Sequence, residues 1–133
     1  MISAAQQVTT VLLVDSPRSV LEALRARLSL ESGLSIVGGA DDATLAINLA
    51  RELAPDVVVV DAEASDLDAT KLARAIAGGD QPPAVVVLTQ HAVAAQHRLE
   101  KVPATVVGKH EGFLSLVHAI QSASRPRITR VRQ

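Results

Sequence analysis

Four short runs of β-branched and aliphatic residues stand out in the hydrophobic pattern of this chain. They cover residues 11–14, 57–60, 84–88 and 105–107. A continuous apolar run of this length is typical of a strand buried on both faces, as in a parallel sheet covered by helices. A further apolar stretch at residues 34–37 predicts a fifth strand.

Segments with helical character lie between these runs. In one of them, the apolar positions i, i+3, i+4 and i+7 are Ala46, Leu49, Ala50 and Leu53. Ser16-Pro17 is typical of a helix start, since serine is a good cap and proline is tolerated at the first helical position. Strand starts near residues 10, 34, 56, 84 and 104 give five strand-helix units. Right-handed crossovers between such units predict an α/β, doubly wound parallel sheet.

The composition indicates one domain with an aliphatic core. Of the 133 residues 48% are hydrophobic, but Phe113 is the single aromatic residue, so stacking platforms for nucleic-acid bases are excluded. The absence of cysteine excludes disulfides, zinc thiolates and a thiol nucleophile. No signal peptide or membrane-spanning segment is recognisable, and we expect a cytoplasmic protein. The four histidines lack metal-ligand spacing and are expected on the surface.

Charge is unevenly distributed along the chain. The net charge is -1, yet residues 125–133 contain four arginines and no acid. We expect a polar leader at residues 1–8, a folded domain at 9–124 and a basic C-terminal tail at 125–133. The tail is open to three interpretations: a solvated terminus, an anchor on an acidic protein surface, or an arm that binds nucleic acid weakly through its phosphates. Its basic residues are Arg125, Arg127, Arg130 and Arg132.

Polar residues whose side chains could act in binding or catalysis follow four of the predicted strands. They are Asp15, Asp61, Thr89 and Lys109. Each of them alone would be an ordinary turn, cap or strand-end residue. In an open parallel sheet, however, sites are built in the crevice outside the carboxyl ends of the strands. Two acids, a hydroxyl and a lysine are therefore expected to meet at one edge of the sheet.

With this ordered set, the chain resembles the receiver domains of two-component response regulators. VLLVDSPRSVLEALR resembles the first strand and helix of that family, and GLSIVGGADDATLAINLARELAPDVVVVD resembles its nitrate-regulator (NarL) class. The resemblance covers about residues 9–123. It implies a flavodoxin-like sheet of five parallel strands in the order 2-1-3-4-5, with five helices.

The resemblance also implies a role for each residue of the set. Asp61 would be the phosphoacceptor, which takes a phosphoryl group from a kinase histidine. Mg²⁺ would be held by Asp15, Asp61 and the backbone carbonyl of Glu63. Thr89 and Lys109 would contact phosphoryl oxygens, since this transfer depends on positioning and charge neutralisation.

Three positions depart from the family pattern. Ser16 stands where receivers usually have a second acid. Because Mg²⁺ prefers anionic oxygen ligands, we expect weak metal binding and interpret Ser16 as a helix cap rather than a ligand. Gln90 replaces a small residue after Thr89, and its bulk could narrow the path of the phosphodonor. Val106 stands at the switch position, where the family has an aromatic residue.

Two functions remain open at this point. The first is a stand-alone receiver that is phosphorylated on Asp61 and acts by protein-protein contact, without a DNA-binding output domain. The second is a degenerate receiver that serves, without phosphorylation, as an adaptor or accessory subunit of a larger complex. An enzyme acting on other substrates is not expected; the resemblance implies only that a receiver catalyses its own phosphoryl transfer and autodephosphorylation. The expected partners are proteins, such as a histidine kinase, and a monomer is favoured.

Overall fold

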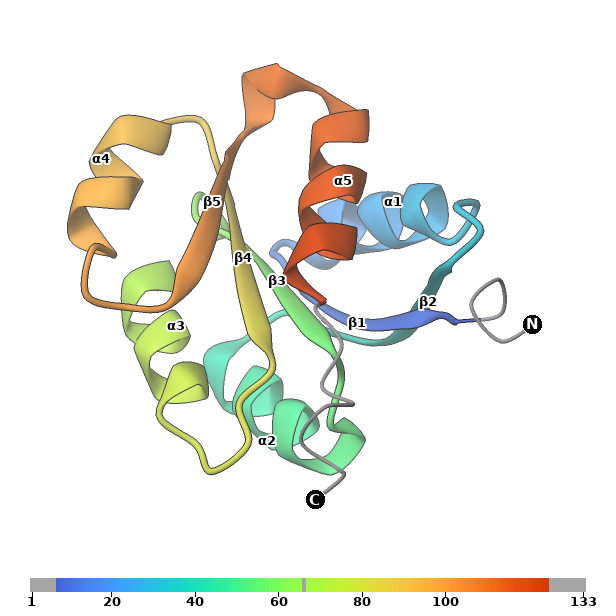
Figure 1. Ribbon diagram of the computed structural model, residues 1–133, viewed down its shortest axis with the longest axis horizontal. Helices are drawn as coiled ribbons and strands as arrows, with labels where there is room; N and C mark the ends of the chain where they lie inside the picture. The colour runs from blue at the N-terminus through green and yellow to red at the C-terminus, as the bar shows by residue number, and fades with distance from the viewer. Residues whose placement is uncertain (1–6, 66, 125–133) are drawn as a thin grey trace.

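The computed structural model describes residues 7–65 and 67–124. Its five strands form one sheet, and Figure 1 shows that the sheet is twisted, with helices on both of its faces. The strands are β1 (Thr9–Val14), β2 (Leu34–Ala40), β3 (Val57–Asp61), β4 (Ala84–Thr89) and β5 (Ala104–Gly108). The helices are α1 (Arg18–Leu28), α2 (Ala43–Leu53), α3 (Ala69–Ala77), α4 (Ala92–Arg98), the 3-10 helix η2 (Lys109–Glu111) and α5 (Phe113–Ala123). The predicted basic tail and most of the predicted leader lie outside the described residues.

All neighbouring strands are parallel, and their order is β2-β1-β3-β4-β5. The predicted flavodoxin-like order is therefore confirmed. The chain runs from β1 to β2 at one edge of the sheet and then crosses to β3 on the other side of β1. This reversal creates a switch point, and the crevice at the carboxyl ends of β1 and β3 is where such sheets place their sites.

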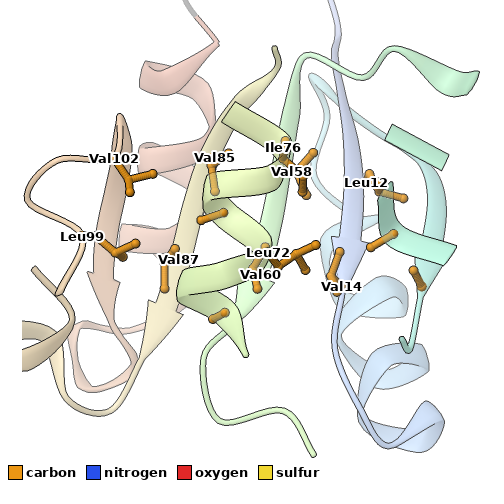
Figure 2. Close-up of a cluster of buried hydrophobic side chains, with 14 residues drawn as sticks. Leu12, Val14, Val58, Val60, Leu72, Ile76, Val85, Val87, Leu99 and Val102 are labelled. Atoms are coloured by element: carbon orange, nitrogen blue, oxygen red, sulfur yellow. The ribbon is translucent and has the colours of Figure 1, made fainter. Parts of the chain in front are cut away.

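Alternate residues of the central strands pack into two hydrophobic layers, one on each face of the sheet. One layer lies under α2 and α3, and Figure 2 shows its strand residues Leu12, Val14, Val58, Val60, Val85 and Val87. The other layer lies under α1 and α5 and includes Val11, Leu13, Val57, Val59, Val86 and Val107. Complete burial of such a side chain contributes roughly 1.5–3 kcal/mol. A slip by one residue would exchange the two layers, so the packing fixes where each strand ends.

The start of α1 differs from the prediction. The helix begins at Arg18, and Pro17 occupies the cap position with φ -72° and ψ 172° and no side-chain hydrogen bond to the helix. Ser16 is therefore not the helix cap. The φ that proline imposes is as compatible with extended backbone as with a helix, and the Ser16 N-H is already bound to the carboxylate of Asp15.

Strand β2 extends three residues further than predicted, through Gly38 and Gly39 to Ala40. Glycine is depleted in strands, which is why the sequence pattern placed the end at Val37. In the structure the glycines admit helices close to both faces: a Cβ atom at Gly38 would lie 2.9 Å from Leu53 Cδ1.

Among the helices of residues 7–65 and 67–124, none is long and apolar enough to cross a membrane.

Candidate functional site

Three polar residues are buried in the part of the chain that the structure describes, and all three lie at the carboxyl edge of the sheet. The exposed fraction is 2% for Asp15, 6% for Asp61 and 1% for Thr89. Burying a polar group is costly unless it is paired. Their concentration at the switch point, which the strand-end pattern predicted, indicates a site.

Lys109 joins these residues from the far side of β4. It is the first residue of η2, directly after β5, and the Gly108 N-H donates a 2.8 Å hydrogen bond to Glu111 Oε2, which closes this turn. The Lys109 ammonium lies 2.9 Å from Asp61 Oδ1 and 3.0 Å from Glu63 Oε1. Partial burial by itself lowers the pKa of Lys109, but the hydrogen bonds and charges of the two carboxylates outweigh it and raise the pKa above 10.5. Lys109 is thus fixed as a cation at this edge.

Asp15 and Asp61 interact directly across the neighbouring ends of β1 and β3. Burial, and then the negative charge of Asp61, raise the pKa of Asp15 from 3.8 to about 6. The 2.7 Å hydrogen bond from the Ser16 N-H to Asp15 Oδ1 and the charge of Lys109 act in the opposite direction. The two carboxylates are therefore held closer together than their own charges favour.

The side chain of Glu63 is part of the site, and sequence reasoning had assigned a role only to its backbone carbonyl. Glu63 Oε2 accepts a 2.6 Å hydrogen bond from the Thr89 hydroxyl, and Oε1 accepts a 2.9 Å bond from the Gln90 N-H. Burial by itself raises the pKa of Glu63, but these bonds and Lys109 outweigh it and lower the pKa below 4.5. One sequence feature could have indicated this role of the Glu63 side chain. It is an acid two residues after Asp61, at the edge of the sheet where Lys109 and Thr89 were also expected.

The remaining predicted positions lie around this centre. Ser16 is half-buried, and its carbonyl accepts a 3.4 Å hydrogen bond from the Ser65 N-H. Gln90 is exposed at the start of the β4-α4 connection. Val106 is partly buried and packs against the hydrophobic layer under α2 and α3. The predicted surface location of the histidines is confirmed, since all four are exposed: His91, His97, His110 and His118.

Asp15 and Asp61 supply oxygen donors of the kind that the Mg²⁺ implied by the resemblance prefers. The charge of Asp61 raises the pKa of Asp15, so the pair still carries negative charge that Lys109 does not fully neutralise. A hard divalent cation is suited to neutralise such a pair. Within residues 7–65 and 67–124, no three acidic or histidine side chains are arranged as a metal site. The side chains of Asp15 and Asp61 thus offer two anionic oxygen ligands at this edge, one carboxylate fewer than the family pattern has.

A doubly wound sheet with its buried polar residues gathered at the switch point defines an α/β domain whose site lies at the carboxyl edge. Residues 11–121 match the response regulator receiver domain family, and the chain belongs to this family. Receiver domains of this family work in two-component signalling.

Relatives and solved structures agree with this assignment. Protein-glutamate methylesterase/protein-glutamine glutaminase 5 of Anaeromyxobacter dehalogenans (strain 2CP-C) is 30% identical over 127 residues, which are 86% of this chain and 35% of that protein. This chain thus spans about a third of that relative's length. The receiver domain of the response regulator NarL from Mycobacterium tuberculosis shares the fold, with a TM-score of 0.78, 24% identity and coverage of 91% of this chain and 99% of that one. A LuxR-family response regulator from Aurantimonas sp. SI85-9A1 has a TM-score of 0.78, 28% identity and coverage of 89% and 86%.

Proposed function

We propose that this receiver accepts a phosphoryl group on Asp61 and signals by contact with another protein. The observation that carries the proposal is the Lys109 ammonium at 2.9 Å from Asp61 Oδ1, in a buried edge that also contains Asp15 and Thr89. A solvated turn aspartate would have neither the buried acid beside it nor the fixed cation. Enzymatic action on other substrates is not part of the proposal.

In the proposed reaction an Asp61 carboxylate oxygen attacks the phosphorus of a phosphohistidine. The new O-P bond forms as the P-N bond breaks, and the leaving imidazole takes up a proton. Because the transferred group carries charge on its equatorial oxygens, catalysis consists of holding and neutralising them. Lys109 supplies a positive charge and Thr89 supplies a hydroxyl donor at the neighbouring strand ends.

Asp15, Asp61 and the Glu63 carbonyl are the groups that would hold Mg²⁺. When bound, the ion would supply further positive charge against the phosphoryl oxygens. Ser16 leaves this set short of one carboxylate, so affinity for the metal is proposed to be weak.

The direct test is the intact mass of the protein after incubation with acetyl phosphate, with and without Mg²⁺. We expect a single phosphoryl adduct that forms only with Mg²⁺ and is absent from the Asp61→Asn variant. Asp56→Asn is a matched control, because it changes an acid at the opposite end of β3 and should leave the adduct in place. An adduct that persists in Asp61→Asn would place the acceptor elsewhere.

A degenerate, phosphorylation-independent adaptor is the second candidate. It is favoured by Ser16 and Val106, which lack the acid and the aromatic ring of the family pattern, and by the Glu63 carboxylate, which binds both Thr89 and Lys109. The two functions predict different behaviour of a partner captured from the native cell. Equal binding by wild type and Asp61→Asn would favour the adaptor, whereas loss of binding would favour the phosphorylated receiver.

The stand-alone organisation is also a proposal, together with a cytoplasmic location and a monomeric state. An antibody raised against this chain tests the organisation in the native cell: a band near 13.9 kDa supports it, and a larger band rejects it. Deletion of residues 125–133 tests the basic tail as a partner contact. Weaker capture of the partner, with the adduct unchanged, is the expected result.

A further inference from the structure

The Glu63 carboxylate makes the contacts that a phosphoryl group on Asp61 would need. Both of its oxygens are bound: Oε2 by the Thr89 hydroxyl at 2.6 Å, and Oε1 by the Lys109 ammonium at 3.0 Å and the Gln90 N-H at 2.9 Å. These contacts are charge-assisted and therefore stronger than neutral hydrogen bonds. An anionic group of this chain thus fills the oxyanion position beside Asp61.

We propose that Glu63 is an internal competitor for the phosphoryl position, and that its side chain must leave Thr89 and Lys109 before Asp61 can carry a phosphoryl group. This inference rests on the proposed function, because it concerns the same site. A threonine hydroxyl has one hydrogen to donate, and Thr89 donates it to Glu63. The Lys109 ammonium already faces the carboxylates of Asp61 and Glu63, so a phosphoryl group there would add further negative charge beside Glu63. Because Thr89 has one hydrogen, its contacts with Glu63 and with a phosphoryl group exclude one another.

The same side chain links the site to the start of α4. Glu63 binds the Gln90 N-H, and the Thr89 oxygen accepts a 3.0 Å hydrogen bond from the His91 N-H. Gln90 and His91 connect β4 to α4, whose Val93 is 87% exposed. When a phosphoryl group takes Thr89 and Lys109, the Glu63-Gln90 bond is lost and the β4-α4 connection is released. Glu63 therefore provides a route from the site to the surface that does not require an aromatic ring at Val106.

The first test uses inorganic phosphate as the probe and the backbone amides of Gln90 and His91, followed by NMR, as reporters. Glu63→Ala is expected to bind phosphate at least about fivefold more tightly than wild type, because a site that is mostly self-occupied loses apparent affinity in proportion to its free fraction. Glu63→Asp keeps the charge but is one methylene shorter, so it should lose the Thr89 contact and also bind more tightly. Glu52→Ala removes an exposed negative charge from α2 and serves as the control for net charge.

The second test is the rate of adduct formation with acetyl phosphate and Mg²⁺. Faster adduct formation in Glu63→Ala, together with tighter phosphate binding, supports the competitor. Unchanged phosphate affinity in Glu63→Ala, or an equal gain in Glu52→Ala, overturns it, even if wild type is phosphorylated. If no variant forms an adduct, the proposed function fails, while the phosphate titration still decides the role of Glu63. Should Glu63→Ala be unfolded by circular dichroism, Glu63→Gln replaces it, with a smaller gain expected.

Discussion

Lys109 and Asp61 form an ion pair of 2.9 Å although Asp61 ends β3 and Lys109 follows β5, and these strands are not neighbours in the sheet. Strand β4 lies between β3 and β5, so the lysine side chain reaches across one strand end to the carboxylate. It is the cation among Asp15, Asp61 and Glu63, and it interacts with all three. The stability of this edge therefore depends on one side chain, supplied by the first residue after the last strand.

Replacing Lys109 should destabilise the protein at neutral pH. Lys109→Ala leaves Asp61 and Glu63 without their cation, and we expect the free energy of unfolding to fall by about 1–2 kcal/mol, less than for a fully buried pair because the lysine is partly exposed. Urea denaturation at pH 7 measures this. Lys101→Ala removes an exposed lysine and is the control; an equal effect of the two substitutions would contradict the prediction.

Asp15 should make the protein less stable as the pH rises from about 4 to about 7. Its folded pKa of about 6 lies above the reference value of 3.8, so in this range the folded state binds more protons than the unfolded state. The free energy of unfolding then decreases with rising pH and levels off above the folded pKa. The full decrease is about 2–3 kcal/mol.

Asp15→Asn isolates this effect. The variant should be more stable than wild type at pH 7.5, and its stability should not fall between pH 5 and 7. Urea denaturation at several pH values provides the comparison. The pKa of Glu63 is lowered and that of Lys109 is raised, so both titrate outside this window. A wild type whose stability increases from pH 5 to 7 would show that burial and the charge of Asp61 do not raise the pKa of Asp15 in the folded state.

The positions of most site residues could be predicted because they depend on strand ends. A run of valines that is buried on both faces ends where the sheet ends, so Asp61 and Thr89 had to lie at its carboxyl edge. The α2 cap is a local contact of the same kind, because Asp42 Oδ1 accepts a 2.8 Å hydrogen bond from the Leu45 N-H three residues further on.

The role of the Glu63 side chain could not be predicted in the same way. Its direction is set by Thr89 at the end of β4 and Lys109 at the start of η2, whose positions depend on the folded sheet. The prediction that Ser16 caps α1 was wrong for a related reason. Pro17 permits both extended and helical neighbours, and the Asp15 carboxylate, by binding the Ser16 N-H, contributes to the choice.

A pair at the other end of the sheet should contribute to stability without affecting the site. Asp56 Oδ2 accepts hydrogen bonds from the Thr10 N-H at 2.9 Å and the Thr10 hydroxyl at 3.1 Å, and the Asp56 N-H donates to Thr10 Oγ1 at 2.9 Å. Asp56→Ala leaves the Thr10 donors without this partner, and we expect a loss of about 1–3 kcal/mol in urea denaturation. Asp80→Ala, on an exposed loop, should have little effect. A changed rate of phosphoryl-adduct formation in Asp56→Ala would contradict the assignment of this pair to stability alone.

Restoring the missing acid should strengthen Mg²⁺ binding. Ser16→Asp adds a carboxylate next to Asp15, and since even indirect changes around a metal alter affinity by about 10- to 100-fold, we expect a gain of at least about tenfold. Without metal, the added charge should lower the thermal midpoint, because Asp15 already has a raised pKa beside Asp61. Isothermal titration calorimetry with MgCl₂ and thermal unfolding at increasing Mg²⁺ measure the two effects. Ser19→Asp places the same charge on the exposed first turn of α1, so an equal gain there would mean that general charge, and not a ligand at position 16, limits the affinity.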